Sequence, residues 1–190
     1  MKPKLILLIA FFSISNYSIS QKEIQYGLKA GINISDLTGV TFGWEPRVSI
    51  HFGGVLEIPI SEDMSIQTEL LFSSQGVNDS SFFSDDQIIT NYLNLPVNAK
   101  YFITEDFSIE LGPQLGILLS ANSEIDGSDE NIKGDLNSLD FGLNTGIEYK
   151  FENGLNLGFR YVFGLSNVAK DISSNKIKNG VLQISSGYFF

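Results

Sequence analysis

The sequence contains a single histidine, His51, and no cysteine. A lone imidazole excludes any site that needs two histidines, and the missing thiols exclude disulfides, thiolate metal sites and cysteine nucleophiles. No Gly-rich phosphate loop, His-Glu-x-x-His pair or Gly-x-Ser-x-Gly elbow occurs. His51 could act as a general base in lipid hydrolysis, but a hydrogen bond inside the protein, near Ser49 and Glu57, is the favoured interpretation.

Charged residues at alternate positions offer a second chemistry. Glu69 and Glu110 could form an acid–base pair if they lie at similar depths. Because buried charge is costly unless it is paired, we instead expect Lys29, Lys100 and Arg160 to bridge the glutamates. The predicted interior charge network comprises Lys29, Glu57, Glu69, Lys100, Glu110, Asp140, Glu148 and Arg160.

An acidic segment offers a third chemistry. Asp126-Gly127-Ser128-Asp129 supplies hard oxygen ligands of the kind that Ca²⁺ prefers, but it lacks the full spacing of an EF-hand loop. A solvated acidic loop is therefore the favoured interpretation. We predict no cofactor and no catalytic residue.

The overall charge excludes another class of function. The 190 residues carry a formal net charge of −10, and only 18% of them are charged. Binding to the phosphate backbone requires clustered Lys and Arg, so a nucleic-acid partner is not expected.

The N-terminus has the layout of a secretory signal peptide. Lys2 and Lys4 precede an unbroken apolar run from Leu5 to Phe12, and Ser18-Ile19-Ser20 offers the small residues that a signal peptidase reads. We predict a signal peptide over residues 1–20, Sec-type export, and a mature domain over residues 21–190. The apolar run is too short to span a membrane as a helix, which needs about 20 residues.

The mature chain alternates with a period of two, which is typical of β-strands with one apolar and one polar face. The clearest segments are 26–35, 107–120, 140–151 and 155–166, and weaker ones lie near 48–58, 65–74, 88–102 and 180–190. Most of these eight segments have the length that a tilted strand needs to cross a bilayer.

Short and long connections alternate between these segments. The short turns are 59–64, 103–106 and 152–154, and the long polar loops are 36–47, 76–87, 122–136 and 167–179. This layout predicts an all-β fold, an eight-stranded antiparallel up-and-down transmembrane β-barrel with all long loops on one side. Trp44, Phe82 and Phe83 in these loops could contact a partner or pack on the barrel rim.

Three features favour a membrane barrel with its polar row inside over a soluble lipocalin-like barrel with the reverse arrangement. The polar row is rich in glycine, which suits a crowded small-barrel interior, and its charges have both signs. Aromatic residues of the apolar row gather at the periplasmic strand ends, as in a membrane girdle. The predicted girdle comprises Tyr26, Tyr101, Phe107, Tyr149, Phe151, Tyr188 and Phe190.

The last residues resemble a biogenesis signal. A final Phe190 with Tyr188 two residues earlier is similar to the C-terminal signal that the outer-membrane barrel-assembly machinery reads, although the usual form has glycine where Ser185 lies.

Several segments resemble the PorT-like family of outer-membrane β-barrel proteins from Gram-negative bacteria. These segments are 27–35, 67–73, 92–97, 112–116, Arg160-Tyr161 and 164–167. The resemblance implies an outer-membrane barrel, and some members of that family are tied to secretion and gliding.

The predicted function is that of a non-enzymatic outer-membrane protein with a structural or interaction role, in which any specific activity lies in the four extracellular loops or in an envelope protein partner. Eight strands leave an interior just wide enough to be filled by side chains, so we expect no passive pore. Two alternatives remain open: an outer-membrane lipid-modifying enzyme, and a soluble periplasmic lipocalin-like binder.

Overall fold

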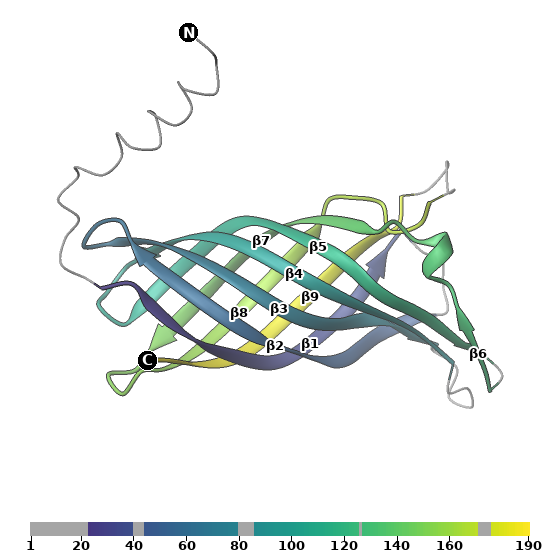
Figure 1. The fold of residues 1–190 in the computed structure, drawn as a ribbon, viewed down its shortest axis with the longest axis horizontal. Helices are drawn as coiled ribbons and strands as arrows, with labels where there is room; N and C mark the ends of the chain where they lie inside the picture. The colour runs from purple at the N-terminus through teal and green to yellow at the C-terminus, as the bar shows by residue number, and fades with distance from the viewer. Residues whose placement is uncertain (1–22, 40–43, 80–85, 126, 171–175) are drawn as a thin grey trace, which may run out of the picture.

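The computed structural model describes residues 23–39, 44–79, 86–125, 127–170 and 176–190, and these form a closed β-barrel (Figure 1). The predicted signal peptide, residues 1–20, lies outside the described residues, as do Phe82 and Phe83. Among the described residues, no helix has the length and apolar character needed to cross a membrane.

Eight long strands form the barrel wall. They are β1 (Gln25–Thr38), β2 (Trp44–Pro59), β3 (Met64–Asp79), β4 (Gln87–Phe102), β5 (Phe107–Ile125), β7 (Leu139–Lys150), β8 (Leu155–Gly164) and β9 (Lys178–Phe189). Each strand pairs antiparallel with its neighbours in chain order, and β9 closes the ring by pairing with β1. The prediction of an eight-stranded antiparallel up-and-down barrel is confirmed.

The long-loop end departs from the predicted strand limits. Trp44 pairs with Asp79 and Arg47 pairs with Ser35, so the prediction that the first long loop extends to Arg47 is wrong. The predicted third long loop contains the end of β5, the short strand β6 (Ser128–Asn131) and the 3₁₀ turn η1 (Lys133–Asp135). These extensions escape the period-two pattern because a strand that leaves the bilayer no longer needs one apolar face.

The two faces of the wall differ as a membrane barrel requires. Leu111, Ile147 and Phe159 of the apolar row are 55%, 43% and 48% exposed on the outer surface. The polar row points into the lumen, where Asn33, Gln67 and Asn98 are fully buried. Because a lipocalin-type barrel has the opposite arrangement, the soluble-binder interpretation is wrong.

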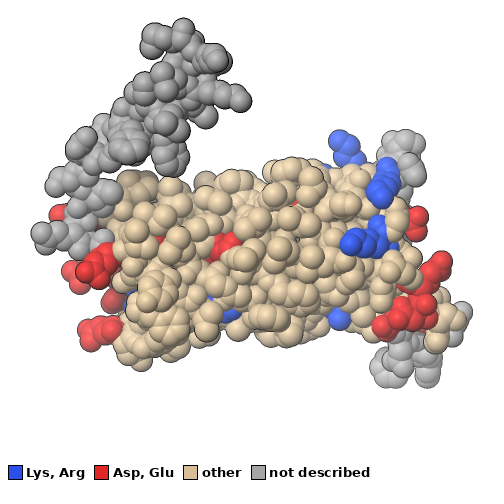
Figure 2. Space-filling model, in the orientation of Figure 1, with Lys and Arg blue, Asp and Glu red and all other residues tan. Residues whose placement is uncertain are grey.

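The surface charges follow the same division. Figure 2 shows Lys, Arg, Asp and Glu mostly gathered at the two ends of the barrel, with a broad band of other residues between them. Such a band is the surface that acyl chains can cover without taking charge out of water.

The seven predicted girdle residues lie at the short-turn end of the barrel. Tyr26 packs against Phe190 with a ring-centroid distance of 5.8 Å, and Tyr188 packs against the same ring at 5.4 Å. Tyr149 and Phe151 meet edge to face at 4.9 Å. The Tyr26–Phe190 contact joins the end of the chain, which follows β9, to β1, and the rings are left partly exposed at one rim of the apolar band.

We predict that Leu111→Arg destabilises the barrel in a bilayer by about 2–4 kcal/mol, because it places a cation near the middle of the lipid-facing band. Leu119→Arg is the matched control on the same face of β5, eight residues nearer the long loops, and should cost only about 0–1 kcal/mol. Urea titration of the two variants in lipid vesicles measures the difference, and equal costs would contradict the assignment of this face to lipid.

Candidate functional site

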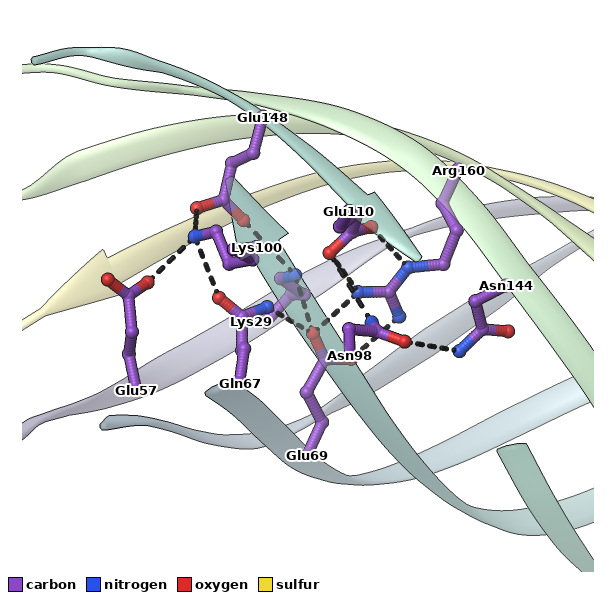
Figure 3. Close-up of polar contacts among 10 residues, drawn as sticks. All are labelled: Lys29, Glu57, Gln67, Glu69, Asn98, Lys100, Glu110, Asn144, Glu148 and Arg160. Atoms are coloured by element: carbon purple, nitrogen blue, oxygen red, sulfur yellow. Dashed lines mark hydrogen bonds and ion pairs between the residues drawn. The ribbon is translucent and has the colours of Figure 1, made fainter. Parts of the chain in front are cut away.

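The inward-facing rows bring seven charged side chains together in the half of the barrel nearest the short turns (Figure 3). Seven of the eight wall strands contribute one residue each, and none of the seven residues is more than 5% exposed. They are Lys29, Glu57, Glu69, Lys100, Glu110, Glu148 and Arg160.

Arg160 on β8 makes a bidentate hydrogen bond to each of two carboxylates. Its Nη1 and Nη2 donate to Glu69 Oε2 and Oε1 at 2.8 and 2.7 Å, and its Nε and Nη2 donate to Glu110 Oε1 and Oε2 at 2.6 and 3.0 Å. Such charge-assisted, bidentate bonds are the strongest that protein side chains make. Since Glu69 lies on β3, four strands from β8 in either direction around the ring, this contact spans the lumen.

Two lysines extend the arrangement. Lys29 Nζ lies 2.8 Å from Glu69 Oε1 and 3.4 Å from Glu148 Oε2. Lys100 Nζ lies 2.6 Å from Glu148 Oε1 and 2.7 Å from Glu57 Oε2. The seven residues therefore form one continuous chain of alternating charge, which we call the lumen network: Glu57, Lys100, Glu148, Lys29, Glu69, Arg160, Glu110.

Neutral amides complete the hydrogen bonding of these ions. Gln67 donates to Glu69 at 2.6 Å and accepts from Lys100 at 3.0 Å. Asn98 donates to Glu110 at 3.3 Å and accepts from Asn144 at 3.1 Å. Sequence reasoning missed these three amides, although each occupies the inward row of its strand and so carried the signal that could have found it.

Gly146 provides room for the lumen network. A Cβ at this position would lie 2.8 Å from Glu110 Oε1 and 2.7 Å from the carbonyl oxygen of Phe159. A larger residue would therefore push against both a network carboxylate and the neighbouring strand. The lumen network therefore explains why glycine occupies position 146 in the inward row.

Asp140 lies apart from the lumen network, which corrects the prediction that grouped it with the other seven residues. It stands near the long-loop end of β7, where it accepts hydrogen bonds from Ser166 Oγ and, at 2.8 Å, from Asn179 Nδ2. Among the described residues, no ion pair includes it. The period of two assigns a residue to a face of the wall but gives no information on its depth along the barrel axis. The alternation therefore predicted that Asp140 faces the lumen, but it could not predict which residues Asp140 contacts.

His51 also faces the lumen and is 2% exposed. Its Nδ1 lies 2.8 Å from Asn33 Oδ1, and Gln183 Nε2 donates to the same oxygen at 3.0 Å. An amide oxygen only accepts hydrogen bonds, so Nδ1 carries the proton. The imidazole thus belongs to an internal hydrogen-bond cluster and points away from the lipid-facing surface.

Two of the long loops meet over the end of the barrel opposite the short turns. Leu136 and Ala169 form an isolated β-bridge, Asn137 N donates to the Val168 carbonyl at 2.8 Å, and Lys170 N donates to the Asp135 carbonyl at 2.9 Å. We call this paired segment, residues 132–137 and 167–170, the lid. Ile132 and Leu136 of the lid pack on a buried apolar cluster of Tyr92, Leu118 and Ala121.

The candidate calcium segment receives no support from the geometry. Asp126 lies outside the described residues. In the part of the chain that the structure describes, no group of three or more His, Asp or Glu side chains is arranged to hold a metal ion.

Residues 16–170 match the family model described as the outer membrane protein beta-barrel domain. The chain belongs to this family. Membership of this family implies that the barrel lies in the outer membrane of a Gram-negative bacterium. In such barrels the short turns face the periplasm and the long loops face the cell exterior. The lid is therefore extracellular, and the lumen network lies in the periplasmic half.

Solved structures agree with the fold. The chain is similar to the attachment invasion locus protein Ail of Yersinia pestis, with a TM-score of 0.56 and 15% identity over 89% of this chain and 100% of that one. The complex of Ail with the heparin analogue sucrose octasulfate gives a TM-score of 0.53 and 13% identity over the same shares. At such identities the likeness concerns architecture alone. A comparison with curated proteins finds no significant match.

We predict that Arg160→Met destabilises the barrel by about 3–5 kcal/mol, because it leaves Glu69 and Glu110 buried with less compensating charge. Lys133→Met, which removes an exposed cation from the lid, is the control and should change stability by no more than about 0.5 kcal/mol. Guanidinium unfolding in detergent, followed by the gel shift between folded and boiled protein, measures both. Similar midpoints for the two variants would mean that the lumen network adds little stability.

Proposed function

We propose that this protein is a non-enzymatic outer-membrane barrel that carries no steady ion current and acts through its extracellular loops. The observation that supports this most directly is the lumen network, whose Arg160–Glu69 ion pair joins strands on opposite sides of the barrel. Such a chain of paired side chains occupies the space that a conducting pore would need.

The long-loop end provides independent support for a closed barrel. The lid reaches across this end and packs on Tyr92 and Leu118, which are 1% and 3% exposed. An ion that entered from outside would first meet this apolar layer and then the paired charges beneath it. Both barriers would have to rearrange for passive conduction.

The non-enzymatic assignment follows from where the chemistry-bearing side chains lie. A lipid-modifying enzyme requires catalytic groups on the lipid-facing surface near one rim. His51 and the network glutamates instead face the lumen, where each makes at least one hydrogen bond or ion pair. We therefore place any specific activity in the loops or in an envelope protein partner, consistent with the secretion-associated members of the PorT-like family.

Biogenesis adds two further interactions to the proposal. The chain would be exported by a Sec-type pathway under the direction of residues 1–20, and its Tyr188 and Phe190 would be read by the barrel-assembly machinery. Once inserted, the apolar outer face would contact outer-membrane lipid, with the aromatic girdle at the periplasmic interface.

Planar-bilayer recording tests the closed barrel. We expect no steady conductance from the natural sequence, and an increased frequency of open events from Lys29→Ser/Lys100→Ser/Arg160→Ser, which removes all three cations of the lumen network. Leu111→Ala/Ile147→Ala/Phe159→Ala, on the outer face, is the control and should stay silent. A large steady current from the natural sequence would overturn the proposal.

Photo-crosslinking in cells tests the role of the loops. A crosslinking amino acid in place of Glu130 on β6 should give a discrete adduct with an envelope protein, because this extracellular strand is exposed. The same substitution at Glu105 in a periplasmic turn is the control. Adducts at Glu105 with none at Glu130 would move the interaction surface to the periplasmic side.

A further inference from the structure

A cavity of about 130 Å³ lies between the lid and the inner wall of the extracellular end. The lid contributes Ile132, Leu136 and Val168, and the wall contributes Val77, Ile88 and Thr90. Val77 is fully buried and Thr90 is 4% exposed, so the wall side of this cavity is cut off from bulk water.

The lining is uncharged and, apart from the hydroxyl of Thr90 and the indole of Trp44, its side chains are apolar. No charged side chain is among the described residues that surround the cavity. Backbone groups of the lid are hydrogen-bonded: Lys170 N donates to the Asp135 carbonyl within the lid at 2.9 Å, and Val168 N donates to the carbonyl of Ile177, outside the lid, at 2.8 Å. Because these backbone groups are already hydrogen-bonded, the lid faces the cavity mainly with apolar side chains. A water molecule in the cavity would therefore find few hydrogen-bond partners.

The cavity is also separated from the ions of the lumen network. Ile132 and Leu136 line it and at the same time pack on Tyr92, Leu118 and Ala121. This cluster belongs to the extracellular half, whereas the network lies in the periplasmic half. The position is thus a small apolar compartment at the extracellular end, separated from the charged part of the lumen.

The geometry points to a binding site for a small, uncharged, apolar molecule of about the size of benzene. An engineered apolar cavity of about 150 Å³ in another protein stays dry and binds benzene. Burial of an apolar surface is favourable in such a site, and the hydrogen-bonded lid already forms one of its walls. The site goes beyond the proposed function, because it requires neither a protein partner nor a closed lumen.

The single tryptophan of the chain, Trp44, lines this cavity and reports on its occupancy. Bromobenzene, whose heavy atom quenches indole fluorescence at contact, is the probe for the full-length barrel in detergent micelles. We expect quenching that saturates in the natural sequence and is at least fivefold weaker in Ala169→Phe, which fills the cavity from the lid. The matched control Ala99→Phe, on the lipid-facing side of β4, should quench as the natural sequence does.

Linear, unsaturated quenching that is equal in all three proteins would show that the probe merely partitions into the micelle, and would overturn the site. Methyl NMR provides a measurement that needs no variant. The signals of Ile88, Ile132 and Ile177 should shift with saturation as bromobenzene is added, and those of the lipid-facing Ile66, Ile109 and Ile147 should drift linearly. Identical behaviour of the two groups would contradict the proposal, and neither result depends on conductance.

Discussion

Four carboxylates and three cations share a lumen in which no member is more than 5% exposed, and the rest of the structure depends on their pairing. An isolated charge in such a place would cost several kcal/mol, so each ion must meet its partners with good geometry. Arg160 satisfies this by gripping Glu69 and Glu110 at once, and Lys29 and Lys100 connect the remaining glutamates. The seven strands must therefore pair in a register that brings all seven side chains to the same depth in the barrel.

The outer surface meets the complementary constraint. In hydrocarbon every backbone N–H and C=O must find a partner within the protein, and a closed ring of strands provides this because it has no edges. Pairing of β1 with β9 closes the ring, and the contacts of the Phe190 ring with Tyr26 and Tyr188 reinforce that seam at the periplasmic rim. Paired ions inside and unbroken apolar side chains outside are thus two consequences of one alternating pattern.

Much of this architecture could be predicted because a period of two assigns each residue to one of two faces. The eight wall strands follow from that alternation. The inward position of Lys29, Glu69 and Arg160 follows from it only together with the glycine content and mixed charges of the polar row and the aromatic residues at the strand ends. Depth along the barrel does not, and for this reason Asp140 was grouped with ions that lie in the other half. The partner of each lysine also depends on the shear between strands, which no local pattern encodes.

The extracellular end was harder to predict for a different reason. The lid forms through contacts between two loops more than 30 residues apart, such as the bond from Asn137 N to the Val168 carbonyl. Polar loop residues carry no periodic signal, so neither the Leu136–Ala169 bridge nor the apolar cavity beneath it could be read from the sequence. Trp44 was predicted to lie in a loop, and it begins β2 instead.

Paramagnetic relaxation from lipids that carry a nitroxide on the acyl chain tests the central claim most directly. In nanodiscs that contain such lipids, the side-chain signals of Leu111, Ile147 and Phe159 should broaden strongly, and the side-chain amides of Gln67, Asn98 and Asn144 should stay sharp. Broadening of the amides with the three apolar side chains protected would mean that the faces of the barrel are reversed, and would contradict this account.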